Sequence, residues 1–209
     1  MKKIFKLINT EFKRNKKLYV FVTILLIIGF ITGSFFITIL SSEDKKLVGE
    51  TISNFFNQIK NNNVDIIYTL RTSLSTNLIY IIFIWLLGIS IIGIPIIVFL
   101  IFIKSFILGF SISSIIFKYK LSGTLLSLGY TFPHQILNLL IISFIGLYAL
   151  KVSISLIKLI LSKKQINFKL IIKKYFAVLI ICVILTLIST AFETFVCPYF
   201  IKMLSFLIK

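Results

Sequence analysis

Long apolar runs without charges alternate along the chain with shorter basic or polar segments, and this pattern predicts helices that cross a membrane. Leu18–Leu40 gives 23 residues without a charge, enough to cross a hydrocarbon core about 30 Å thick. The run exceeds a signal-peptide core and lacks an Ala-x-Ala cleavage site, so we interpret it as a retained first span. Later apolar runs predict further spans at Leu78–Ile103, Tyr130–Leu150 and Tyr175–Val196.

Ser105–Phe117 predicts a shorter helix with a small-residue face. Its 13 residues are too few to span alone, although the lysines that follow could extend it by snorkelling. Ser105, Gly109 and Ser113 recur at every fourth position, so on a helix they share one side. Small residues at this spacing allow close helix–helix contact in a membrane. We therefore expect this face to meet another span.

Ser41–Asn77 is the one long polar connection between apolar runs, and its four acidic residues balance its four basic ones. Apolar residues recur in it at helical spacing, namely Val48, Ile52, Phe55, Phe56 and Ile59. This pattern predicts an amphipathic helix at a surface. A net charge near zero favours the extracytoplasmic side for the whole 41–77 segment.

The composition places the protein in the all-α integral membrane class. Hydrophobic residues make up 58% of the 209 residues and the mean hydropathy is +1.08, above the range of soluble domains. The formal charge of +17 comes from lysines that flank apolar runs. No groove-reading or RNA-binding motif accompanies them, so we expect the partners of these charges to be anionic lipids and not nucleic acid.

Lysine-rich segments predict the topology. Residues 1–17 carry seven basic side chains and residues 151–174 carry seven lysines, so both are expected to be cytoplasmic. An even number of crossings must separate them, which makes the short 105–117 segment a fourth crossing. The sequence thus predicts a bundle of about five helices, with the N-terminus inside and the C-terminus outside. Residues 78–209 form its membrane core, with a basic cytoplasmic loop at 151–174.

A few polar residues lie inside the predicted spans. Pro133, His134 and Asn138 fall in one apolar run, and Glu193 lies near the end of the last. At 1.5 Å per residue, His134 and Glu193 both sit roughly 24–27 Å above the cytoplasmic ends of their helices. This matched depth predicts a polar cluster of His134, Asn138 and Glu193. The alternatives are that His134 simply finds a local partner, and that Glu193 snorkels to the outer interface without touching the others.

The sequence offers no catalytic machinery. It contains no activated nucleophile, paired carboxylates, set of metal ligands or phosphate-binding loop. Cys182 and Cys197 are too few for a disulfide framework. We therefore expect a protein that is not an enzyme and needs no cofactor or metal.

Two motifs resemble the stage II sporulation protein M family. The family pattern Pro-His-x-(Ile/Leu)-x-Glu-Leu is similar to Pro133–Leu139, where Asn138 replaces the glutamate. The pattern Ala-x-x-Glu-x-x-x-x-Pro is similar to Ala191–Pro198, which carries Glu193. The stretch from Lys104 to Ser111 is also similar to the family's Gly-rich third span. The resemblance covers about residues 80–200.

The resemblance implies a function at the septal membrane of the mother cell during endospore formation. A member would be a scaffold that recruits or holds the wall-degrading stage II sporulation proteins D and P during engulfment. The sequence leaves a second function open, a transporter or channel subunit, including a permease associated with an ATP-binding cassette, because intramembrane His134 and Glu193 also suit proton relays. The expected location in either case is the bacterial cytoplasmic membrane, and the oligomeric state stays open.

Overall fold

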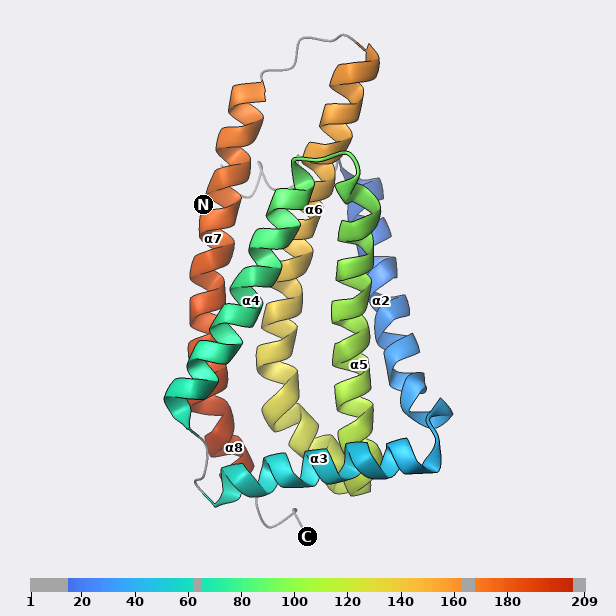
Figure 1. Cartoon of the computed structure of the whole chain (residues 1–209), viewed down its shortest axis with the longest axis vertical. Helices are drawn as coiled ribbons and strands as arrows, with labels where there is room; N and C mark the ends of the chain where they lie inside the picture. The colour runs from blue at the N-terminus through green and yellow to red at the C-terminus, as the bar shows by residue number, and fades with distance from the viewer. Residues whose placement is uncertain (1–14, 62–64, 163–167, 205–209) are drawn as a thin grey trace.

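The computed structural model describes residues 15–61, 65–162 and 168–204, and all elements within them are helical. Five helices run along the long axis, whereas α3 crosses one end of the bundle and α8 lies at that same end (Figure 1). Two π-helical turns, η1 and η2, interrupt the chain near that end. The elements in order are α2 (Lys16–Ile39), α3 (Ser42–Lys60), α4 (Ile66–Gly88), α5 (Gly93–Leu126), η1 (Ser127–Thr131), α6 (Phe132–Ser162), α7 (Phe168–Ala191), η2 (Phe192–Val196) and α8 (Cys197–Met203).

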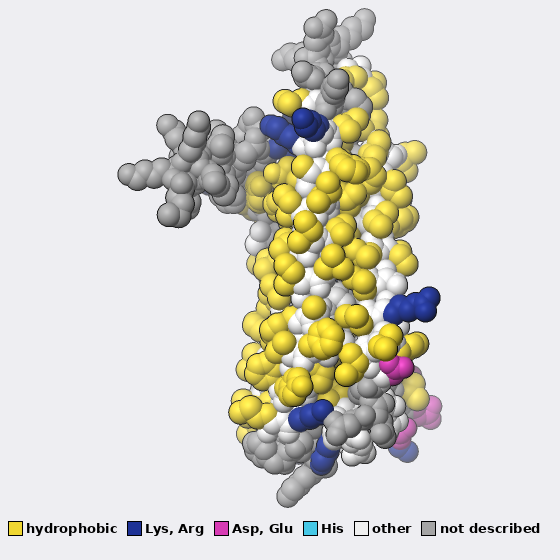
Figure 2. Space-filling view, turned by 90° about the vertical axis from the view of Figure 1, so that its left-hand side faces the viewer, with side chains coloured by type: hydrophobic (Ala, Val, Ile, Leu, Met, Phe, Trp, Pro, Cys, Tyr) yellow, Lys and Arg dark blue, Asp and Glu magenta, His cyan; other side chains and the backbone are white. Residues whose placement is uncertain are grey.

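Within the described residues, four helical stretches are long and apolar enough to cross a membrane. One of them, Gly93–Leu161, includes both α5 and α6, and the chain reverses within α5 at Lys120 (φ 53°, ψ −127°). The reversal is tight, because a Cβ on Gly123 would collide with the Ile115 carbonyl oxygen. Hydrophobic side chains cover most of the visible face of the bundle (Figure 2). The protein is therefore a helical, multi-pass membrane protein.

The predicted span Leu78–Ile103 is wrong, because a turn divides it. The first part belongs to α4, which begins at Ile66, and the second belongs to α5, which begins at Gly93. The turn is close-packed, since a Cβ on Gly93 would collide with the Leu87 carbonyl oxygen. Consequently Ser105–Phe117 is not a separate short span but the second half of the α5 pass.

The predicted basic loop 151–174 is helical where the structure describes it. Residues 151–162 continue α6 and residues 168–174 begin α7, so both helices extend beyond the turn between α4 and α5 (Figure 1). The remainder of that segment, 163–167, lies outside the described residues. The predicted basic N-terminus, residues 1–17, also lies outside them except for its last three residues.

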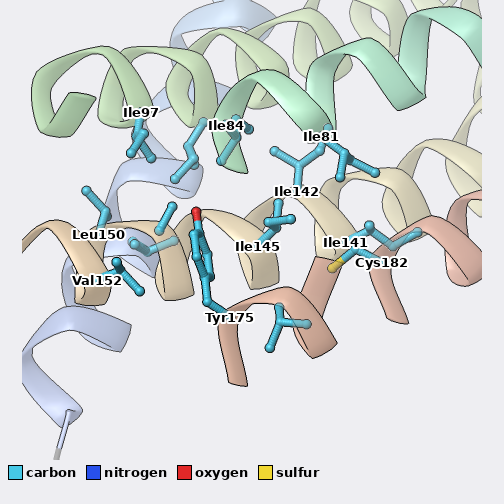
Figure 3. Close-up of a cluster of buried hydrophobic side chains, with 14 residues drawn as sticks. Ile81, Ile84, Ile97, Ile141, Ile142, Ile145, Leu150, Val152, Tyr175 and Cys182 are labelled. Atoms are coloured by element: carbon cyan, nitrogen blue, oxygen red, sulfur yellow. The ribbon is translucent and has the colours of Figure 1, made fainter. Parts of the chain in front are cut away.

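The main hydrophobic core lies between α4, α5, α6 and α7 (Figure 3). Tyr175 is fully buried there, stacks on Trp85 with ring centroids 5.6 Å apart, and donates a hydrogen bond to the Trp85 carbonyl oxygen at 2.8 Å. Gly88 permits this arrangement, because a Cβ at that position would collide with the Tyr175 hydroxyl. The Ser153 hydroxyl then donates to the Gly88 and Ser90 carbonyl oxygens, at 2.9 and 3.0 Å, and so ties α6 to the turn after α4.

Small residues form the contact between α2 and α5. Ser105 is fully buried and donates a hydrogen bond to a carbonyl oxygen of α2, and a Cβ on Gly109 would collide with the Phe30 carbonyl oxygen. The other side of the contact is Gly29 and Gly33, a pair that the sequence analysis did not single out. Ser113, the third predicted residue of the face, is half-buried.

The amphipathic segment forms α3, which packs across the end of the bundle. The Ser41 hydroxyl caps the helix by accepting from the Asp44 N–H at 3.1 Å. Phe56 and Ile59 are its buried apolar side chains, and they pack against Ile115, Leu126 and Ile201 from α5 and α8. Burial of this apolar stripe explains why a helix of otherwise polar composition lies against the bundle.

Candidate functional site

Two wide π-helical turns bring the predicted polar residues together at the α3 end of the bundle. In η1 the Phe132 N–H bonds to the Ser127 carbonyl oxygen, five residues back, and in η2 the Cys197 N–H bonds to the Phe192 carbonyl oxygen in the same way. His134 follows η1 directly, and Glu193 is part of η2. Such turns are frequent at functional sites because they re-aim side chains out of regular helical register.

His134 is the centre of the site, with only 3% of its surface exposed. Its Nδ1 lies 2.7 Å from the Tyr130 carbonyl oxygen one turn back, and its Nε2 lies 3.8 Å from Glu193 Oε1. The Cys197 sulfur is 3.6 Å from Nδ1, and the Ser189 hydroxyl donates to the His134 carbonyl oxygen at 3.4 Å. The ring is thus contacted by groups from η1, η2 and α8, and the His134 backbone by a group from α7.

Glu193 connects this histidine to α4. The Ser73 hydroxyl donates a hydrogen bond of 3.1 Å to Glu193 Oε1, the same oxygen that faces His134. The glutamate side chain is 16% exposed, so it is largely removed from solvent. A carboxylate in that position needs compensating charge or hydrogen bonds.

Lys104 of α5 supplies a positive charge to the site. Its charge acts on both Glu193 and His134, while its ammonium donates to Asn77 Oδ1 at 3.5 Å and lies 5.2 Å from the centre of the Tyr80 ring. The sequence analysis placed Lys104 at the end of a span and missed this role. The signal that would have found it is spacing, since Ser73, Asn77 and Tyr80 lie on one side of α4 at helical intervals.

The other predicted residues have more limited roles. Asn138 is buried one turn further along α6, but the described contacts include none between its amide and His134 or Glu193. Pro133 is the second residue of α6 and Pro198 the second of α8, positions at which the missing proline N–H costs a helix little. Both therefore begin helices on either side of the site without touching its charges.

The site consists of charges and hydrogen bonds between helices. Among the described residues, no three His, Cys, Asp or Glu side chains are placed to hold a metal ion. The site is instead a set of charges and hydrogen bonds that links α4, α5, α6 and α8. It lies under the α3 end, where a second cluster of Phe55, Phe56 and Tyr130 packs ring against ring at 5.3 to 6.3 Å, and the Tyr130 ring in turn contacts the His134 ring at 5.2 Å.

Comparison with protein families places the chain. The model of stage II sporulation protein M matches residues 22–198, which include the whole of both sequence motifs, Lys104 and the α2–α5 contact. No curated protein and no solved structure matches the chain. With all but the ends of the chain matched, the protein belongs to the stage II sporulation protein M family.

Proposed function

We propose that this protein is a non-enzymatic membrane scaffold that holds peptidoglycan-degrading partners at the septal membrane during endospore formation. The observation that carries the proposal is the site itself. Its side chains join helices at the α3 end of the bundle. Family membership supports the sporulation context, and the partners proposed on that basis are the stage II sporulation proteins D and P.

The charge distribution supports an orientation with the α3 end outside the cell and five crossings. At the ends of α2, α6 and α7 that lie away from α3, the charged side chains among the described residues are all basic. They are Lys16, Lys17, Lys151, Lys158, Lys173 and Lys174. The acidic residues Glu43, Asp44, Glu50 and Asp65 all lie in or next to α3. Because basic segments stay on the cytoplasmic side, the site would lie near the outer surface, within reach of extracytoplasmic partners.

Fusions test this topology. Alkaline phosphatase, which is active only outside the cytoplasm, should be active when fused after the C-terminus and inactive when fused after Lys164. The reverse pattern would contradict the orientation, and two active fusions would contradict a crossing by α7.

Affinity capture tests the scaffold. The tagged protein should co-purify wall hydrolases from sporulating cells, and the variant Glu193→Gln should retain less of them because the carboxylate that faces His134 and offsets the charge of Lys104 is lost. Glu50→Gln is the matched control, since Glu50 is exposed on α3. Equal capture by an unrelated membrane protein of similar abundance would exclude a scaffold.

A transporter subunit is the second candidate, favoured by the ionisable Lys104, Glu193 and His134 inside the bundle. Such residues in membranes often belong to ion or proton pathways. The two functions differ in one strain: a transporter carrying Glu193→Gln should lose flux and keep its partners, whereas a scaffold should lose partners and show no flux to begin with.

A further inference from the structure

The position of one proton on His134 follows from its neighbour. The Tyr130 carbonyl oxygen, 2.7 Å from Nδ1, can only accept a hydrogen bond. Nδ1 must therefore carry a hydrogen in every state of the ring, because two acceptors would repel each other at this distance. Cys197, on the same side of the ring, approaches a nitrogen that is already donating.

The second ring nitrogen then faces a carboxylate. In a neutral ring whose hydrogen is on Nδ1, Nε2 is an acceptor with no hydrogen of its own. It lies 3.8 Å from Glu193 Oε1, beyond the range of a hydrogen bond. A separation slightly beyond contact distance is expected for two acceptors that have no proton between them.

Burial and the surrounding charges act on whether the pair holds that proton. Removal from water disfavours a charged ring most strongly, Glu193 on η2 and the Tyr130 carbonyl oxygen favour it, and Lys104 on α5 opposes it. The remaining titratable neighbours are the Tyr130 hydroxyl on η1 and the Cys197 thiol on α8, while α4 and α7 contribute the non-titrating Ser73, Asn77 and Ser189. Glu193 thus interacts electrostatically with Lys104, and with the His134 ring once that ring gains its second proton.

We propose that His134 Nε2 and Glu193 Oε1 together form a binding site for a single proton, taken from water at the α3 end. The Nε2 lone pair forms the N–H bond as one O–H bond of a hydronium ion breaks, and the electron pair of that O–H bond stays on the departing water. The charged hydrogen bond would shorten the 3.8 Å contact to about 2.7–2.9 Å. Because Glu193 lies in η2, directly before α8, uptake draws η2 and α8 toward α6. The proposal concerns the protein alone and holds whatever partners it has.

The chain carries one histidine, so NMR of protein labelled with ¹⁵N-histidine in lipid reports this site alone. We expect a neutral ring with its hydrogen on Nδ1 at alkaline pH, the less common tautomer of free histidine, and conversion to a doubly protonated ring as the pH falls. Glu193→Gln should weaken proton binding about tenfold or more, as removal of an adjacent opposite charge does. Lys104→Met should strengthen it, and Glu50→Gln should leave it unchanged.

Three outcomes would overturn the proposal. A neutral ring with its hydrogen on Nε2 would contradict the geometry, and a ring that stays doubly protonated from pH 5 to 9 would be a permanent ion pair instead of a proton site. Equal titration of the His134 ring in the wild type and in Glu193→Gln would show that Glu193 takes no part in proton binding. Spectra of Glu50→Gln should match the wild type. Failure of the wild-type protein to capture wall hydrolases in cells would count against the scaffold and not against the proton site.

Discussion

The Ser105 hydroxyl donates a hydrogen bond of 2.6 Å to the Leu26 carbonyl oxygen, and so joins α5 directly to the backbone of α2. Such a bond requires the two helices to lie unusually close, and glycines on α2 make this possible. A Cβ on Gly29 would lie 2.8 Å from the Phe102 carbonyl oxygen, and one on Gly33 would collide with the Phe106 carbonyl oxygen. Hydrogen bonds between membrane helices average only about 0.6 kcal/mol, so we expect close backbone packing to matter more than the bond.

Gly33→Ala should therefore destabilise the protein by about 1–3 kcal/mol, the usual cost of inserting atoms into a packed contact. Equilibrium unfolding in detergent measures the change. Gly49→Ala on α3 is the matched control, because its new methyl group would meet only the flexible end of Lys118 at 3.3 Å and alanine favours helix. If the two variants unfold alike, the α2–α5 contact is looser than described.

Lys120→Gly should stabilise the protein by about 1 kcal/mol. Lys120 has φ 53°, a backbone conformation that costs a side-chain-bearing residue about 1–3 kcal/mol and glycine almost nothing. Lys118→Gly, two residues earlier in regular helix, should instead cost about 1 kcal/mol. Thermal unfolding of the two variants should shift in opposite directions, and a destabilised Lys120→Gly would show that the side chain itself is needed at the reversal.

Ser153→Ala should destabilise the end of the bundle away from α3 by about 1–3 kcal/mol, since it leaves the buried Gly88 carbonyl oxygen without its side-chain donor. Ser155→Ala is the comparison, because the Ser155 hydroxyl bonds only to the Lys151 carbonyl oxygen of its own helix. Hydrogen exchange should report faster opening of the turn at residues 89–92 in the first variant alone. Similar exchange in both would mean that Ser153 does not hold this turn.

His134→Ala and Glu193→Ala should each lower the free energy of unfolding. The loss in the double variant should be smaller than the sum of the two single losses. Removing one member of the pair leaves the other buried without its partner, whereas removing both leaves neither. We expect a coupling free energy of about 0.5–3 kcal/mol from a double-mutant cycle. Asn138→Ala combined with Glu193→Ala should be additive, because their side chains make no described contact. Additivity in the first cycle would refute the pair.

Much of the fold follows from the sequence, but the turn between α4 and α5 does not. Polarity normally marks where a span ends, and the residues at this turn, from Ile89 to Ile92, are mostly apolar. Gly88 and Gly93 are the available signal for a turn, but glycines alone do not distinguish a bend within one span from a reversal between two. Lys104 misled in the opposite direction: a charge is expected to end a span, yet here it is stabilised inside α5 by Asn77 and the Tyr80 ring.

The helical rise counted along each span predicts the same membrane depth for His134 and Glu193. In the structure, His134 Nε2 and Glu193 Oε1 lie 3.8 Å apart. The count could not find Ser73, because the polar first half of α4 resembled a loop and was assigned to the surface. Nor could it find η1 and η2, which add a residue to a helical turn and rotate the side chains that follow. Asn138 shows this limit well, since it shares a face with His134 in an ideal helix but makes no described contact with Glu193.

The glycine contact of α2 has a consequence for how the protein is made. α2 ends at Ile39, yet its partner surface on α5 extends to Gly109, about 70 residues later. At about 5–20 residues per second, the ribosome needs about 4–14 s to deliver that surface. Meanwhile α2 stands in the membrane with the Gly29–Gly33 groove open to lipid or to the insertion machinery. A cysteine at Gly33 in chains stalled near residue 92, which contain no native cysteine, should crosslink to that machinery and lose the crosslink once stalling is moved to residue 130.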